Sequence, residues 1–230
     1  NAMYACLPLL GNVSAERLRT EFDKLLCGPA AGKTLNSYPQ VIAALIPEVR
    51  PMFGLGQRNR HHIYTVWEHT VHAVSHIPPV PVLRLCAFFH DIGKPGKMTV
   101  DEDGCGHFYK HELLSEEIAN QVMMRLKYDN CTRETATEII RNHSIVFCPT
   151  PKQARRLLSR LGEENLRMLI ELEIADVKSQ NPLYREERLA NIFSFKETVE
   201  EVLAAKECFS LRSLAIGGKD LLALGVPQSP

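Results

Sequence analysis

The sequence lacks the features that would place the protein in a membrane or on a secretory route. It has no run of about 18 consecutive apolar residues, which is roughly what a transmembrane helix needs. The N-terminal residues do not have the layout of a signal peptide. We expect Asn1-Ala2, ahead of Met3, to be the remnant of a tag and Met3 to be the natural start. These absences predict a cytoplasmic protein that makes no membrane contact.

The chain also lacks an excess of charge of either sign. The 27 Lys and Arg residues balance the 27 Asp and Glu residues, so the formal net charge is zero. No overall basic field exists that would hold nucleic acid, although a local basic patch is compatible with this balance.

Paired cysteines are missing as well. The seven cysteines are an odd number at irregular spacings, and no two of them form a Cys-x-x-Cys pair. This pattern favours a reduced, cytoplasmic protein and excludes zinc-finger chemistry. Cys86 lies in an apolar run and is expected to be a small core residue.

Apolar residues recur at helical spacing along most of the chain, which predicts an all-α fold. Ser14 is a good N-cap for a first helix that Gly28-Pro29 ends. The exception is 98–109, where Asp101–Gly104 has the composition of a tight turn in a short β-hairpin. We expect a single helical domain over 1–230, with a core at about 60–180 and flanking helices on both sides. The other predicted helices are one that starts at Asn36 or Ser37, then 63–76, 82–90, 111–127, 132–143, 150–162, 163–178, 183–208 and a short capped helix within 216–225.

Histidine is distributed unevenly, because all nine histidines lie between His61 and His143. The most informative of them is His90, which stands beside Asp91 at the end of an apolar stretch. Burying two adjacent polar groups without partners is costly, and a metal ion that binds both offsets that cost. Lys94 follows within the same segment and can place a positive charge near a phosphate.

Four further residues are candidate ligands of the same metal centre: His69, His111, His143 and Asp176. Simpler roles remain open for each feature. A helical histidine such as His69 is often structural, Asp91 can cap a helix end, Lys94 can be solvated, and Asp176 can pair with a basic side chain. His72 and His76 share a helix with His69, but Glu-His-x-x-His is not the zinc-protease order His-Glu-x-x-His, so we expect them not to bind metal.

The order His, His-Asp, His, His, Asp resembles the HD superfamily of metal-dependent phosphohydrolases. Several segments are similar, more closely, to the C-terminal HD region of bacterial tRNA nucleotidyltransferases, the CCA-adding enzymes. They are Ser14-Ala-Glu-Arg17, Pro47-Glu48, 57–62, Thr65-Val-Trp-Glu-His-Thr70, His90-Asp-Ile-Gly-Lys-Pro95, Gly106-His-Phe-Tyr109, His111-Glu112, Arg155-Arg-Leu-Leu158 and Ile216-Gly-Gly-Lys-Asp-Leu-Leu222. The similarity covers essentially the whole chain. It implies an HD-domain helical bundle.

Two departures from that family pattern bear on function. The Gly-Gly-x-x-Arg-Asp motif of the nucleotidyltransferase head is not found here, since Gly217-Gly218 is followed by Lys219-Asp220. Nucleotide addition to tRNA is therefore not expected. Lys110 stands before His111 where the family often has glycine, which places a long cation beside the expected metals.

The resemblance implies a metal-dependent phosphohydrolase that acts on nucleotide-like phosphomonoesters or cyclic phosphodiesters. One divalent metal would be held by His69, His90, Asp91 and Asp176, and a second by His111, His143 and Asp91. A metal-activated water would attack phosphorus, with Asp91 and Lys94 as the catalytic residues.

Substrate contacts are expected from Lys94, Lys110 and His62. The donor set suits Mn, Fe, Ni, Co or Zn, with Mg a weaker match for the histidines. The competing hypothesis is a non-catalytic body that binds nucleotide or tRNA, or that docks onto a separate transferase head.

Overall fold

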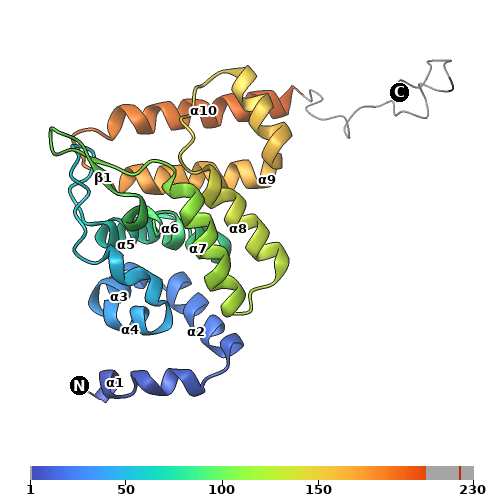
Figure 1. Cartoon of the computed structure of the whole chain (residues 1–230). Helices are drawn as coiled ribbons and strands as arrows, with labels where there is room; N and C mark the ends of the chain where they lie inside the picture. Colours follow the sequence, from blue (N-terminus) through green and yellow to red (C-terminus); the bar gives the residue numbers. More distant parts are fainter. Residues whose placement is uncertain (1, 206–222, 224–230) are drawn as a thin grey trace.

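The computed structural model describes residues 2–205 and 223, and this part of the chain is almost entirely helical (Figure 1). Its elements are α1 (Ala2–Ala5), the 3-10 helix η1 (Leu7–Asn12), α2 (Ala15–Cys27), α3 (Ala31–Ser37), α4 (Pro39–Leu45), the 3-10 helix η2 (Pro47–Met52), α5 (Val66–His76), α6 (Pro81–Phe89), the 3-10 helix η3 (Lys94–Lys97), β1 (Thr99–Val100), β2 (Gly106–His107), α7 (His111–Arg125), α8 (Asn130–Asn142), α9 (Pro151–Lys178) and α10 (Glu186–Ala204). The predicted all-α fold with one hairpin is confirmed.

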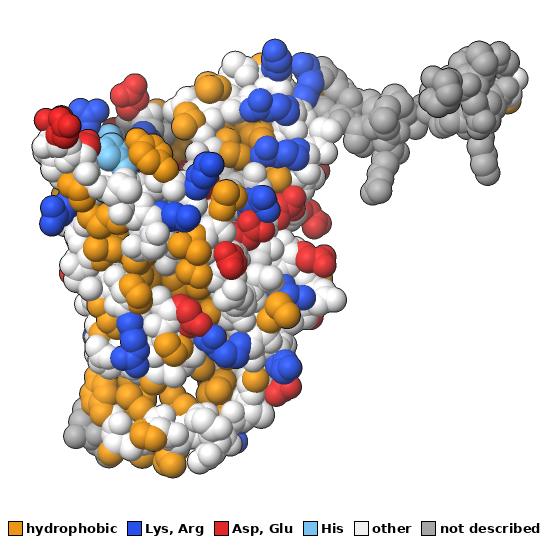
Figure 2. All heavy atoms as spheres, in the orientation of Figure 1, with side chains coloured by type: hydrophobic (Ala, Val, Ile, Leu, Met, Phe, Trp, Pro, Cys, Tyr) orange, Lys and Arg blue, Asp and Glu red, His pale blue; other side chains and the backbone are white. Residues whose placement is uncertain are grey.

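The helices lie in three tiers. In Figure 1, α10 runs beside the second half of α9 at the top, α5 to α8 occupy the middle, and α1 to α4 lie at the bottom. Figure 2 shows that hydrophobic side chains are frequent on the lower part of this face, whereas Lys and Arg side chains gather toward the top, near α9 and α10. No helix among residues 2–205 is long and apolar enough to cross a membrane.

Helix α6 is the centre of the core, as its mostly apolar sequence predicts, and its buried Arg84 donates to the backbone carbonyls of Leu26 and Pro78. It packs against α2, α5, α7, α8 and α9. Because it is covered on all sides, Leu85, Cys86, Phe88 and Phe89 have no exposed surface. Its C-terminal end therefore delivers the next residues, His90 and Asp91, into the middle of the molecule.

Capping residues set several helix starts. Ser14 caps α2 by accepting a hydrogen bond from the backbone N–H of Arg17, as predicted. Helix α5 begins three residues later than predicted, because Thr65 and Glu68 form a capping box that fixes the start at Val66.

The prediction of a helix that starts at Asn36 or Ser37 is wrong. These residues end α3, and the next helix starts at Pro39. Proline favours the first turn of a helix because its fixed φ matches the helix and it has no N–H to leave unpaired.

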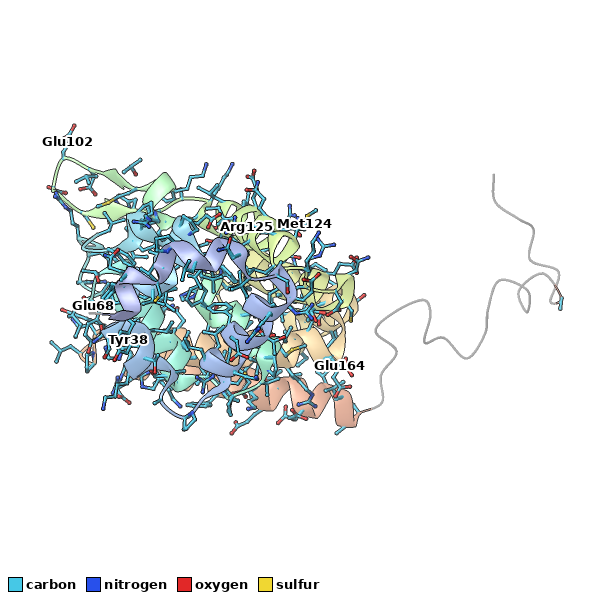
Figure 3. The ribbon with its side chains drawn as sticks, turned by 90° about the horizontal axis from the view of Figure 1, so that it is seen from below. Tyr38, Glu68, Glu102, Met124, Arg125 and Glu164 are labelled. Carbon is cyan, nitrogen blue, oxygen red and sulfur yellow. The ribbon has the colours of Figure 1, made fainter. Side chains whose placement is uncertain are left out.

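The hairpin is short and is held by its turn. Thr99 pairs with His107 and Val100 with Gly106 in antiparallel register. Asp101 Oδ1 accepts backbone hydrogen bonds from Asp103 and Cys105, and its Oδ2 lies 2.7 Å from His107 Nε2. Figure 3 shows Glu102 at the tip, pointing away from the body.

The two helices predicted on either side of Gly162 are continuous except at that residue. Gly162 has φ of 78° and ψ of 168°, so the chain kinks between the first half of α9 and the half that carries Asp176. The helix predicted at 183–208 is seen as α10, which begins at Glu186. The helix predicted within 216–225 lies outside the part of the chain that the structure describes.

Candidate metal centre

Five helices bring the six predicted ligand residues to one place. His69 comes from α5, His90-Asp91 from the end of α6, His111 from the first turn of α7, His143 from the end of α8 and Asp176 from the last turns of α9. Two groups with the spacing of a metal site result, and Asp91 belongs to both. In each group the ligand atoms lie within 4.8 Å of one another.

The first group surrounds Asp91 Oδ2 and Asp176 Oδ1. His69 Nε2 lies 2.7 Å from Asp176 Oδ1 and 3.4 Å from Asp91 Oδ2. His90 Nε2 lies 3.2 Å from Asp91 Oδ2, and the two Nε2 atoms are 3.3 Å apart. Two imidazole nitrogens and two carboxylate oxygens therefore converge on one point.

The second group uses the other oxygen of Asp91. Oδ1 lies 3.2 Å from His111 Nε2 and 3.7 Å from His143 Nε2, and these two nitrogens are 3.1 Å apart. The two oxygens of one carboxylate thus face different pairs of histidines, which is the arrangement of a carboxylate that bridges two cations.

The backbone fixes the tautomer of all four histidines. Each Nδ1 lies within hydrogen-bond distance of a carbonyl oxygen: Ser179 for His69 at 3.2 Å, Ala87 for His90 at 2.9 Å, Phe108 for His111 at 2.8 Å and Ile140 for His143 at 2.6 Å. A carbonyl oxygen only accepts, so Nδ1 carries the proton and donates it. In the neutral ring Nε2 then presents a lone pair toward the cluster.

These lone pairs make the cluster a site for cations. Paired Nε2 atoms at 3.1 and 3.3 Å cannot hydrogen-bond to each other when both are acceptors. Together with the oxygens of Asp91 and Asp176 they form a buried set of acceptors without enough protons. The donor set fits a divalent metal ion.

Electrostatic interactions within the cluster point the same way. Burial tends to lower the pKa of His90, but Asp91 and Asp176 raise it to about 10, so this imidazole takes up a second proton when no other cation neutralises the two carboxylates. Burial tends to raise the pKa of the Asp91 carboxyl, but the positive charges of His90 and Lys94 outweigh burial and hold that pKa well below its usual range. Burial likewise tends to raise the pKa of Asp176, and His69 and His90 hold it well below the usual range. Burial lowers the pKa of His143. The carboxylates are therefore ionised and attract positive charge.

Lys94 contacts the cluster directly. Its Nζ lies 2.7 Å from Asp91 Oδ2 and donates to Gln57 Oε1 at the same distance. The ammonium group also lies over the ring of Phe108. A buried lysine held between a carboxylate and an amide is not a solvated surface residue. Gln57 was not picked out as a functional residue from the sequence.

A cavity of about 310 Å³ opens onto the cluster and reaches away from it toward α10. Asp91, Lys94, His111 and His143 line its metal end, and His62 lines it too. His62 contacts the ring of His69, and burial lowers the pKa of His62 to about 3, so this imidazole is neutral. Lys110 is exposed and lines a smaller neighbouring hollow with His62, Lys94 and His111.

Sequence reasoning missed four polar residues that line this cavity. They are Glu173, Gln180, Arg188 and Asn191. Glu173 could have been found, because it lies one helical turn before Asp176 on the apolar side of α9. The residues of α10 carry no signal of this kind.

His72 and His76 lie outside both ligand groups. The ring of His72 stacks on Tyr64, and His76 Nδ1 lies 3.1 Å from Ser179 Oγ. These contacts give them structural roles among the described residues.

Comparison with known proteins assigns the chain to a family. The family described as "HD domain" matches residues 60–178, which is more than half of the chain. The chain belongs to the HD domain family. All six residues of the cluster fall within the matched range. A second family, described as "Probable RNA and SrmB- binding site of polymerase A", matches residues 1–39.

Relatives of this HD-domain chain include tRNA nucleotidyltransferases. It is 30% identical over 223 residues to a CC-adding tRNA nucleotidyltransferase of Thermus thermophilus, covering 94% of this chain and 49% of the relative. It is 29% identical over 225 residues to an A-adding tRNA nucleotidyltransferase of Deinococcus radiodurans, covering 94% of this chain and 51% of the relative. A multifunctional CCA protein of Methylococcus capsulatus is 28% identical over 160 residues, covering 64% of this chain and 36% of the relative. The chain thus spans about half the length of the first two relatives.

Proposed function

We propose that this protein is a metal-dependent phosphohydrolase that cleaves nucleotide-like phosphomonoesters or cyclic phosphodiesters. The observation that carries the proposal is the cluster itself: four histidine Nε2 lone pairs and the carboxylates of Asp91 and Asp176 converge at one end of a cavity. A ligand set that is only structural has no need of a cavity that opens onto it. Phosphate esters match this arrangement, because metal ions and a neighbouring lysine together neutralise the negative charge of a phosphoryl group.

The residues divide into two proposed metal sites. His69, His90, Asp91 and Asp176 would hold one divalent ion, and His111, His143 and the other oxygen of Asp91 would hold a second. Mn, Fe, Ni, Co and Zn suit these ligands, with Mg a weaker match. When bound, such ions lower the pKa of water and polarise a phosphoryl group.

The chain's own residues would orient the substrate and balance its charge. Lys94, held by Gln57 and Asp91, places a fixed ammonium group where charge develops on the phosphoryl oxygens. Lys110 is exposed in the neighbouring hollow and would attract the anionic substrate. His62, neutral and half-buried against His69, would contact the substrate without adding charge.

The test is a phosphatase and phosphodiesterase screen. Protein treated with EDTA is assayed with added Mn²⁺, Ni²⁺, Co²⁺, Zn²⁺ or Mg²⁺ on nucleoside monophosphates, 2′,3′-cyclic nucleotides and p-nitrophenyl phosphate. We expect turnover only when a transition metal is added. Asp91→Asn should lower kcat/KM by about 100-fold or more, since several kcal/mol of charge stabilisation depend on this ligand.

Asp103→Asn is the matched control, because Asp103 is exposed in the hairpin turn. It should keep wild-type turnover, and circular dichroism should show that both variants are folded. Wild-type turnover in a folded Asp91→Asn protein would contradict the proposal. Metal binding without cleavage of any substrate would favour the binding-module alternative.

A second candidate function, interaction with tRNA, is supported by a separate observation. Residues 1–39 match a family described as an RNA-binding site, and the relatives that cover 94% of the chain carry the name of tRNA nucleotidyltransferases. A local basic surface also exists, since the first half of α9 contains Lys152, Arg155, Arg156 and Arg160. A filter-binding assay with tRNA at several salt concentrations tests this function, and affinity that does not fall with salt would contradict it.

A further inference from the structure

The cavity is larger than a phosphate group needs. Its volume is about 310 Å³. Small-molecule sites range from about 300 Å³ upward, so this cavity lies at the lower end of that range. The metal cluster forms one part of the lining, and Glu173 of α9 with Arg188 and Asn191 of α10 form another. The remainder of a phosphorylated substrate would therefore lie beside Glu173, Gln180, Arg188 and Asn191.

Glu173 is the polar group on this wall that lacks a partner. The residue is 5% exposed, and its Oε1 atom is buried without a hydrogen bond. Leaving such an atom unsatisfied costs about 1–3 kcal/mol, and native proteins keep few of them. Burial, with Asp176 nearby, raises the pKa of Glu173 well above its usual range, and its Oε1 atom remains an acceptor without a donor.

The neighbouring polar groups are already committed to one another. Gln180 donates to Asp176 Oδ2 at 2.9 Å and accepts a hydrogen bond from Arg188. Asn191 donates to the backbone carbonyl of Phe147. Because Gln180 and Asn191 are taken, Glu173 Oε1 is left available to a molecule bound in the cavity.

We propose that Glu173 is a specificity-determining residue that binds a hydroxyl group next to the phosphate of the substrate, so that the cavity selects a ribose phosphate over its deoxy counterpart. The inference rests on the proposed function for the placement of the phosphate at the metal end. A hydroxyl group donates a hydrogen bond without carrying charge, which matches the unpartnered Oε1 of Glu173 in the cavity lining. An ammonium group in the same place would be repelled by Lys94 and Arg188, which line the same cavity.

The apolar part of the lining fits the carbon framework of such a substrate. Ile145, Val146 and Phe147 line the cavity, and Phe147 stacks face to face on Phe195 with ring centroids 4.5 Å apart. Apolar side chains together with a few placed polar groups are the usual lining of a small-molecule site.

The experiment compares adenosine 3′-monophosphate with 2′-deoxyadenosine 3′-monophosphate on Mn²⁺-loaded protein. Both kcat/KM and the Kd from calorimetry are measured. We expect wild type to favour the ribose compound by about tenfold or more, because a site built to bond a hydroxyl rejects the analogue that lacks it. Glu173→Leu should bring this ratio close to one by weakening the ribose compound only, and Glu173→Gln, which keeps a donor and an acceptor, should retain most of the preference.

Glu171→Gln is the control, since Glu171 lies on the same helix and pairs with Lys196 on the surface. It should leave the ratio unchanged, and circular dichroism and metal content should be the same in all variants. A wild-type ratio near one, or a ratio that survives in folded Glu173→Leu, would overturn the inference. If turnover is absent but the Kd ratio is present and depends on Glu173, the inference stands and the proposed hydrolysis fails.

Discussion

Asp91 lies between the two proposed metal positions, and one oxygen of its carboxylate faces each of them. Oδ2 faces His69 and His90, and Oδ1 faces His111 and His143. The second position therefore has three protein ligands, whereas the first has four. Fewer ligands give weaker binding, so the second position should lose its metal more readily when one of its ligands is replaced.

His111→Ala and His143→Ala should each remove one metal per chain and leave the other in place. The first group retains all four of its ligands in both variants. We expect inductively coupled plasma mass spectrometry to give about half the wild-type metal content, together with a loss of turnover of about 100-fold. Asp103→Asn, at an exposed residue of the hairpin turn, serves as the control and should change neither quantity.

Unchanged turnover in both His111→Ala and His143→Ala would restrict the functional site to one metal. Loss of all metal in either variant would show that the two positions do not bind independently.

The ligand residues were predictable from the sequence, whereas their surroundings were not. His90-Asp91 stands out because two polar groups directly follow the buried residues of α6. Gly93 has a negative φ, and the reason for glycine there is space: an added Cβ would lie 2.6 Å from the backbone oxygen of His111. Contacts between segments far apart in sequence, such as Gln57 with Lys94, leave no mark on a local pattern.

At the scale of the helix, Gly162 decides how α9 reaches the site. Its φ of 78° with ψ of 168° lies in a region that only glycine occupies readily. The kink separates the basic first half of α9 from the second half, which buries Glu173 and Asp176. The direction of the second half therefore depends on one backbone position.

Gly162→Ala should lower the free energy of unfolding by about 1–3 kcal/mol, because alanine is strained in this conformation. The cost is purely one of the backbone, since an added Cβ would meet no atom within 4 Å. Urea unfolding followed by circular dichroism measures it. Gly11→Ala is the matched control, as that glycine also has open space but no positive φ.

An unfolding free energy for Gly162→Ala within about 0.3 kcal/mol of the Gly11→Ala value would show that α9 can straighten without cost. The expected strain is at least three times larger than that difference.

Helix boundaries were predictable where a side chain caps the helix. Ser14 and Thr150 cap α2 and α9 as their positions in the sequence indicate. Helix α3 was missed because Ala30, at its N-cap position, makes no side-chain hydrogen bond. Local signals fix a helix end when a side chain fixes it, and tertiary packing fixes the others.

For the whole molecule, the cluster ties together helices that are far apart in the sequence. The candidate ligands come from α5, α6, α7, α8 and α9, and α6 packs against all four of the others. A metal that binds these residues binds the folded chain in preference to the unfolded chain, so binding and folding are linked.

Adding Mn²⁺ to protein treated with EDTA should raise the Tm by about 5–10 °C. A ligand at 100 times its Kd stabilises the fold by about 2.7 kcal/mol, and each kcal/mol shifts the Tm of a chain of this size by about 2–4 °C. Differential scanning fluorimetry measures the shift. Asp176→Asn should reduce it strongly, and Asp103→Asn should leave it unchanged. An equal shift in Asp176→Asn would place the stabilising ion elsewhere.

The orientation of the histidines has a consequence for how such a site could change its metal. Three of the four, His90, His111 and His143, bond to the carbonyl of the residue three positions earlier in the chain. The acceptor is a backbone atom, so replacing a side chain does not remove it. Among the described residues, a carboxylate lies near this bond only at His111, whose Nδ1 is 3.6 Å from Glu112 Oε2. In a site whose histidines are oriented by carboxylates, ligand basicity can drift through single replacements of those partners. Here, a change of metal preference would have to come mainly from changes in the ligands themselves or in the cavity. The metal preference of this site should therefore change less readily by mutation than that of a site whose histidines are oriented by carboxylates.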